Sequence, residues 1–180
     1  MKRSMMQIYV ENTAEAVALD FSAYPRIAIV GSPGSGKSTL ARQIAAETGH
    51  PLIHLDYEHW SAGWTHPSKD EWRAMNEEFV RGARWIIDGN YGGTMELRCR
   101  AANLVIFLDV PRMVCIRRVI RRRGVQRPDM KPEVQEESPI LSKDFLKFLW
   151  FIWQYPKKGK RKIMALKEKY PAVEFLTVKD

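Results

Sequence analysis

A glycine-rich segment between an apolar run and a helical pattern carries the clearest chemistry in the chain. It fits the pattern G-x-x-x-x-G-K-[ST] and consists of Gly31, Ser32, Pro33, Gly34, Ser35, Gly36, Lys37, Ser38 and Thr39. Backbone N–H groups in such a bend, and the positive end of the helix that follows, bind phosphate. We expect Lys37 to reach the β- and γ-phosphates and the Ser38 hydroxyl to bind Mg²⁺. The segment therefore predicts a nucleoside triphosphate site.

Two aspartates that follow apolar runs are candidates for a second group on the metal. Asp88 comes after the run 85–87, and Asp109 comes after the run 104–108. A carboxylate at the end of a buried strand beside the first strand can hold Mg²⁺ through water. We favour Asp88, because the glycine-rich residues 89–93 after it resemble a site loop. The alternative role for Asp109 is to cap the helix that begins near Pro111.

Asp56 is the candidate for the acceptor side of the reaction. It ends the apolar run 52–55, at the edge where open α/β sheets bind ligands. A carboxylate there can orient an acceptor hydroxyl and take its proton, whereas the alternative role is a loop cap. Trp60 and Trp64 are expected to wall the acceptor pocket or to cover the sheet edge. All four histidines lie within residues 50–66, but they lack helical i, i+4 spacing, so a metal site is not favoured there.

Arginines after the fourth apolar run form a second candidate for phosphate binding. Arg118 and Arg122 share one helix face, and guanidinium groups bind phosphate oxygens and stack on bases. The alternative, that the arginines are solvated surface charges, applies to some of this cluster. Arg127 begins a stretch that can close over the nucleotide, so residues 117–139 are predicted to form an arginine-rich lid.

The elements that must position these residues alternate between strand and helix. Apolar runs predict strands at 26–30, 52–55, 85–87, 104–108 and 173–178, and helical patterns occupy 38–48, a segment opened by Ser68 and Glu71, 111–123, 142–154 and 157–169. Pro156 is expected to separate the last two helices. The alternation predicts an α/β fold, a three-layer, doubly wound parallel sheet, over residues 26–180. Residues 1–25 form an extension with a weak strand signal at 7–10.

Composition limits the classes of function. The 180 residues carry a formal charge of +8, and no apolar run approaches the ~20 residues of a membrane span. Cys99 and Cys115 are isolated and no apolar segment follows the first residues, which favours a cytoplasmic protein with reduced thiols. The aromatic stretch 145–153 is predicted to pack in the core through Phe145, Leu149, Ile152 and Trp153. The alternative is that this stretch contacts a groove, a membrane or a second copy of the chain. We expect a monomer or a homodimer.

Several motifs together resemble one known family. They are the segment Ile29 to Ala41, His54-Leu-Asp56 with Trp60 and Gly63-Trp64, Trp85-Ile-Ile-Asp88-Gly89-Asn90-Tyr91 with Gly93-Thr94 and Leu97-Arg98, and Arg127-Pro128-Asp129-Met130. This combination covers about residues 26–178. It is similar to the adenylate-kinase-like P-loop proteins called topology modulation proteins.

The resemblance implies a P-loop NTPase fold with five parallel strands in the order 2-3-1-4-5. It also implies transfer of phosphate from ATP, with Mg²⁺, to a small acceptor. Arg118-Val-Ile-Arg-Arg122-Arg123 resembles the R-x-x-x-R-R that opens the adenylate kinase lid, which implies Arg118 near adenine and Arg122 on the phosphates. Metabolite kinases hold their acceptor with an aspartate like Asp56, and the acceptor side here also includes Trp60, Gly89, Asn90, Tyr91, Arg98 and Arg127.

Two alternatives remain open at this point. The phosphate-clamping G-F-P-R of nucleotide kinases is replaced here by Gly89-Asn90-Tyr91-Gly92, which disfavours a nucleoside monophosphate acceptor. A nucleic-acid-associated ATPase that uses the basic helices is the competing class of function. Aromatic side chains exposed among the basic residues would support it, but the helical spacing predicts that these aromatics are buried.

Overall fold

The computed structural model describes residues 8–10, 19–125, 127–134 and 142–179 of the chain. Its strands are β1 (Ile8–Val10), β2 (Arg26–Gly31), β3 (Leu52–His54), β4 (Trp85–Asp88), β5 (Leu104–Leu108) and β6 (Glu174–Val178). Its helices are α2 (Lys37–Thr48), α3 (Leu55–His59), α4 (Lys69–Phe79), α5 (Met95–Ala101), α6 (Arg112–Arg121) and α7 (Lys143–Lys169), with short 3₁₀ turns η1 (Ala62–Trp64) and η2 (Pro132–Val134).

The strands form one sheet in which all neighbours are parallel, in the order β1-β6-β5-β2-β4-β3. The five predicted strands are β2 to β6, so their predicted order 2-3-1-4-5 is confirmed. The weak strand signal near the N-terminus is also confirmed: β1 joins the β6 edge, with Ile8 opposite Leu176. The rest of that extension, apart from residues 19–25, lies outside the described residues. The domain division at residue 25 stays a prediction.

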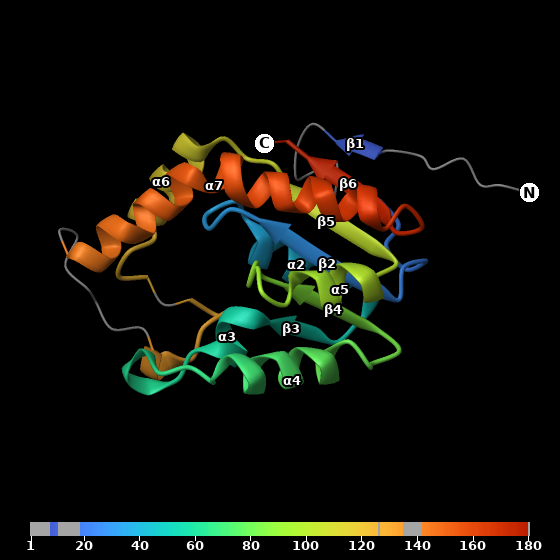
Figure 1. Cartoon of the computed structure of the whole chain (residues 1–180), viewed down its shortest axis with the longest axis horizontal. Helices are drawn as coiled ribbons and strands as arrows, with labels where there is room; N and C mark the ends of the chain where they lie inside the picture. The colour runs from blue at the N-terminus through green and yellow to red at the C-terminus, as the bar shows by residue number, and fades with distance from the viewer. Residues whose placement is uncertain (1–7, 11–18, 126, 135–141, 180) are drawn as a thin grey trace, which may run out of the picture.

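Helices cover both faces of the sheet, and β2 shows why (Figure 1). Its side chains alternate between the faces, so Ile27 and Ile29 enter one core with α2 and α6, while Ala28 and Val30 enter another with α4 and α5. All four side chains are buried. Helix α7 contributes to both cores, with Ile152 on the first and Ile163 on the second. A strand buried on both faces reads as a continuous apolar run, which is why the sequence signal was strong.

Helix ends agree with the sequence signals in two places. Gly49 ends α2 in the left-handed conformation, and its N–H donates to the Ala45 carbonyl. Ser68 and Glu71 form the predicted capping box at the start of α4.

The predicted break at Pro156 is wrong. Helix α7 runs unbroken from Lys143 to Lys169 with Pro156 inside it. A proline inside a helix removes one backbone hydrogen bond and crowds the preceding turn, which destabilises the helix by about 3 kcal/mol. Ile152 and Tyr155 before it, and Ile163 after it, are all buried against the sheet. Burying both halves on the same sheet stabilises one helix more than the proline destabilises it.

The aromatic stretch in α7 is only partly in the core. Ile152 is buried, and Phe145 and Leu149 are partly buried against the same core, as predicted. Trp153 is 38% exposed, so its predicted core position is wrong. The Arg112 guanidinium instead lies 3.8 Å from the centre of the Trp153 ring. Among the residues described, no helix is both long and apolar enough to span a membrane.

Candidate functional site

The phosphate loop connects β2 to α2 at the centre of the sheet. Gly36 caps α2 in the left-handed conformation, with φ of 97°, so the backbone N–H groups of the first helical turn face the loop. The Lys37 ammonium bends back over the loop and donates to the Ser32 carbonyl at 2.9 Å. Burial lowers the pKa of Lys37, while the charges of Asp56 and Asp88 act in the opposite direction. The loop conformation and the position of Lys37 are those expected of a phosphate-binding loop.

Gly34 shows how tightly the loop packs against the arginine-rich helix. Its φ is +81°, and a Cβ added there would lie 2.4 Å from the Cys115 carbonyl oxygen of α6. Only glycine fits, because the conformation and the close approach both exclude a side chain. The loop is therefore fixed by the element that leads into the predicted lid.

Asn90 ties the phosphate loop to the strand beside it. Its side-chain Nδ2 donates to the Gly31 carbonyl at 2.7 Å, and its Oδ1 accepts from the Gly31 N–H at 3.2 Å. The Tyr155 hydroxyl of α7 donates to the same Oδ1 at 3.0 Å. The structure therefore uses the Asn90 amide to hold the phosphate loop, and not for the predicted contact with the acceptor.

Asp56 lies in the first turn of α3, and two predicted acceptor residues meet it. The Tyr91 hydroxyl donates to Asp56 Oδ1 at 2.9 Å, and Arg127 Nη2 lies 3.3 Å from Asp56 Oδ2. Burial and the Asp56 charge raise the pKa of Tyr91, so the phenol stays protonated and remains a donor. Its backbone has φ of 37°, a conformation uncommon outside glycine and often found at functional sites. The structure brings Asp56, Tyr91 and Arg127 together, although they are far apart in sequence.

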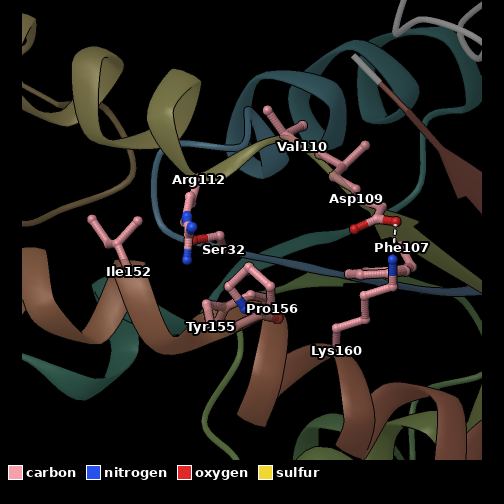
Figure 2. A pocket seen from close by; sticks show the side chains of 10 residues that line it. Ser32, Phe107, Asp109, Val110, Arg112, Ile152, Tyr155, Pro156 and Lys160 are labelled. Carbon is pink, nitrogen blue, oxygen red and sulfur yellow. Dashed lines mark hydrogen bonds and ion pairs between the residues drawn. The ribbon is translucent and has the colours of Figure 1, made fainter.

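The two candidate metal-side aspartates have different surroundings. Asp88 is buried at the end of β4, and its Oδ1 lies 2.5 Å from His54 Nδ1. Asp109 follows β5, and its Oδ2 accepts from the Lys160 ammonium of α7 at 2.6 Å. Figure 2 shows this pair in a small pocket that Ser32 and Tyr155 also line. The α6 cap is Pro111 with no side-chain hydrogen bond, so the alternative capping role of Asp109 is wrong.

Arg98 is a predicted acceptor residue that the structure places in the core. It is 1% exposed, and its guanidinium donates to Asn76 Oδ1, to the Thr94 hydroxyl and to the Asn90 carbonyl at 2.6–2.8 Å. Burial lowers its pKa to about 10, which leaves it charged at neutral pH. Its acceptor role is therefore corrected: Arg98 supports the loop at Gly89 and Asn90 from behind.

Trp60 belongs to an aromatic cluster beside Asp56. Ring centres of His59, Trp60, Trp64, His66, Trp72 and Tyr91 lie 4.5–5.6 Å from their neighbours. Trp64 is 43% exposed, so the cluster reaches the surface. His59 and His66 stack in it, and no group of three potential ligands for a metal occurs in the described ranges. The cluster borders Asp56 through Tyr91, whose hydroxyl donates to the carboxylate.

The predicted nucleotide arginines differ in position. Arg122 directly follows α6, and burial together with the Arg127 charge lowers its pKa, while Asp129 and Asp56 counteract this shift. Arg122 therefore shares the electrostatic environment of Asp56. Arg118 lies on the exposed side of α6, one helical turn earlier. Its predicted contact with adenine stays a prediction.

Asp129 is a site residue that we did not predict. It is buried, and its Oδ2 accepts from the Ser38 hydroxyl at 2.8 Å and from Arg127 Nη2 at 2.6 Å. The only signal in the sequence was its place in the Arg127-Pro128-Asp129-Met130 motif. A contact between residues 91 positions apart has no local pattern that would reveal it.

Residues 27–139 match the model of the AAA_18 family, described as an AAA domain, over more than half of the chain. The chain belongs to this AAA domain family. A curated shikimate kinase from Rhodococcus erythropolis is 31% identical over 100 residues, which cover 48% of this chain. The matched region spans 59% of the length of that relative.

Solved structures show the same fold as this AAA domain. A shikimate kinase from Bacteroides thetaiotaomicron has a TM-score of 0.52 at 20% identity, covering 85% of each chain. A shikimate kinase from Acinetobacter baumannii in complex with shikimate has a TM-score of 0.52 at 14% identity, covering 87% of this chain and 84% of the other. Identities this low establish the architecture alone.

We predict that Arg98→Met lowers the free energy of unfolding of this AAA domain by about 2–5 kcal/mol, because several buried acceptors lose their charged donor. Urea unfolding measures the change. Arg100→Met, on the exposed side of the same helix α5, is the matched control and should stay near wild type. Equal stability of the two variants would contradict a structural role for Arg98.

Proposed function

We propose that the protein is an ATP-dependent kinase that transfers the γ-phosphate to a small acceptor carrying a hydroxyl or phosphate group. One observation carries the proposal: the carboxylate of Asp56 is held by Tyr91 and Arg127 on the side of the sheet where Lys37 covers the phosphate loop. An anion-binding loop and a positioned carboxylate at the same sheet edge are the two parts that phosphoryl transfer to a hydroxyl needs.

Each residue of the site has its own role in the proposed transfer of phosphate. The loop N–H groups and Lys37 bind the phosphates, and Arg122 adds charge that stabilises the transferring group. Asp56 orients the acceptor hydroxyl and takes its proton, with Tyr91 and Arg127 fixing the carboxylate. The Ser38 hydroxyl and the Asp88 carboxylate offer oxygen ligands of the kind Mg²⁺ prefers. Bound Mg²⁺ would neutralise charge on the phosphates.

The acceptor class follows from the surroundings of Asp56. The aromatic cluster around Trp60 offers a wall for an apolar or ring-shaped part, and Arg127 offers a cation. The Rhodococcus relative carries the name shikimate kinase, which supports a hydroxyl-bearing metabolite as acceptor. A cytoplasmic location and a monomeric or homodimeric state belong to this proposal.

A screen of hydroxyl metabolites and nucleosides for acceptor-dependent ADP formation tests the proposal. We expect at least one acceptor to raise ADP formation well above the rate with ATP alone. Nucleosides and sugar phosphates in the same screen distinguish the hydroxyl from the phosphate class. ADP formation that no acceptor changes would contradict the kinase assignment.

We predict that Asp88→Asn lowers turnover and Mg²⁺ affinity by about 10- to 100-fold, the usual effect of losing a group that supports a metal. Asp109→Asn is the matched control, since its carboxylate is already paired with the Lys160 ammonium at 2.6 Å. That pair is partly exposed and contributes about 1 kcal/mol or less to stability. Steady-state rates over a Mg²⁺ titration compare the two, and a larger loss in Asp109→Asn would show that the wrong aspartate was chosen.

A second candidate function is supported by one observation on α7. We expected its aromatics to be buried, but Trp150 is 60% and Phe151 50% exposed, near the exposed Lys147 and Lys157. Aromatic and basic side chains together bind single-stranded nucleic acid. This candidate corresponds to the resemblance to topology modulation proteins. Binding of single-stranded DNA that weakens steeply with salt and is lost in Trp150→Ala would support it.

A further inference from the structure

Asp129 links two parts of the candidate site that the sequence places far apart. Its carboxylate accepts a hydrogen bond of 2.8 Å from the hydroxyl of Ser38, the proposed metal ligand. The same group binds Arg127 through Nη2 at 2.6 Å and Nε at 3.2 Å, and Arg127 in turn reaches Asp56 at 3.3 Å. The result is a continuous chain from Ser38 through Asp129 and Arg127 to Asp56.

The segment that carries Asp129 is anchored next to the phosphate loop. Asp129 is 5% exposed, and Met130 and Val134 after it are buried as well. Burying a carboxylate is unfavourable unless charged or polar partners compensate. Here the partners are the Arg127 guanidinium and the Ser38 hydroxyl, which both donate to the carboxylate. Asp129 therefore forms a buried ion pair with Arg127 next to the loop, and its partners are residues of the candidate site.

The direction of the Ser38 hydrogen bond gives Asp129 a definite effect. The Ser38 hydroxyl donates a hydrogen bond to Asp129, so the lone pairs of the Ser38 oxygen face away from the carboxylate. A hydroxyl in that orientation is ready to bind a cation, and the neighbouring anion makes its oxygen a better ligand. Side chains that orient metal ligands in this way usually contribute about 10- to 100-fold to metal affinity.

We propose that Asp129 is a positioning residue that orients the Ser38 hydroxyl for Mg²⁺ and, through Arg127, couples the metal side of the site to Asp56. The inference rests on the proposed Mg·ATP site. It gives the segment 127–134 a role in the site itself, since its side chains contact both the proposed metal ligand Ser38 and the acceptor carboxylate Asp56.

The test measures how much Mg²⁺ strengthens nucleotide binding. Calorimetric titrations with a non-hydrolysable ATP analogue, with Mg²⁺ and with EDTA, give the gain in affinity due to the metal. We expect Asp129→Asn to reduce that gain by about 10- to 100-fold while affinity in EDTA is unchanged or higher. Glu133→Gln, an exposed carboxylate in the same segment, is the matched control and should keep the gain.

A double-mutant cycle separates orientation of Ser38 from a general structural role. If Asp129 acts through the hydroxyl, Asp129→Asn should have no further effect on the Mg²⁺ gain in a Ser38→Ala background. An equal effect in both backgrounds would overturn the proposal. If Asp129→Asn does not fold, Asp129→Ser, with a smaller group to bury, carries the same expectation.

The outcomes also distinguish this inference from the proposed function. If the wild type does not bind the ATP analogue under either condition, the proposed function fails and the role of Asp129 fails with it. If the wild type shows a Mg²⁺ gain that Asp129→Asn retains, the proposed function stands and only the role of Asp129 is wrong.

Discussion

Asp56→Asn is expected to lower the rate of phosphoryl transfer by about 10²- to 10⁴-fold, the usual range for loss of a general base. An asparagine still accepts a hydrogen bond from Tyr91, but it cannot take the acceptor proton and no longer pairs with Arg127. ATP affinity should be nearly intact, because the proposed site holds the phosphates with the loop and Lys37 and not with Asp56. Steady-state kinetics with a screened acceptor, together with calorimetry of ATP binding, measure both effects.

The control for Asp56→Asn is Asp70→Asn, the same chemical change at an exposed position in the first turn of α4. It should leave transfer near the wild-type rate. A slow ATPase activity is expected to survive in Asp56→Asn, because water needs less positioning by that carboxylate. Transfer that persists at the wild-type rate would show that Asp56 has only a structural role in α3.

Lys37→Ala is expected to weaken binding of Mg·ATP by about 30-fold or more, since truncating a buried charged contact costs about 2–5 kcal/mol. The protein should stay folded, because the hydrogen bond seen for the ammonium is to the Ser32 carbonyl of its own loop. Calorimetry measures the affinity, and urea unfolding checks the fold.

Lys69→Ala, at an exposed position where α4 begins, is the matched control for Lys37→Ala. It removes the same ammonium without touching the loop and should bind Mg·ATP as the wild type does. Unchanged affinity in Lys37→Ala would mean that the loop does not bind the triphosphate.

The sheet was predictable because its central strands β2, β4 and β5 are buried on both faces. Val105 and Phe107 are each at most 1% exposed, and alternate residues of β5 enter opposite cores. Such strands need apolar side chains at every position, which leaves an unambiguous run in the sequence. The phosphate loop was equally clear, because its backbone requires glycines at fixed spacing.

The unpredictable parts depend on contacts between distant residues. Whether Pro156 ends a helix is decided by how both halves of α7 pack on the sheet, and the local sequence contains only the proline. Arginine is a common ligand-binding residue, which is why Arg98 was selected. In the folded chain it donates instead to Asn76 and to the Asn90 carbonyl, and only the tertiary structure reveals these partners. Local propensity cannot reveal such tertiary partners.

The candidate site shows the same division. Asp56 and Tyr91 were both selected as residues that follow strands, and parallel strands bring their carboxyl ends to one edge. Their hydrogen bond at 2.9 Å shows that these two side chains meet. Asp129 belongs to no strand end, and its position depends on how the segment after α6 folds back onto Ser38. That geometry has no signature in the spacing of residues.

The most direct test of the account uses ATP labelled in its γ-phosphate, together with an acceptor from the screen. We expect the label to appear on the acceptor, transfer to require Mg²⁺, and the transfer rate to fall sharply in both Lys37→Ala and Asp56→Asn. Label released only as free phosphate, at a rate that the acceptor does not change, would contradict it and would identify the protein as an ATPase.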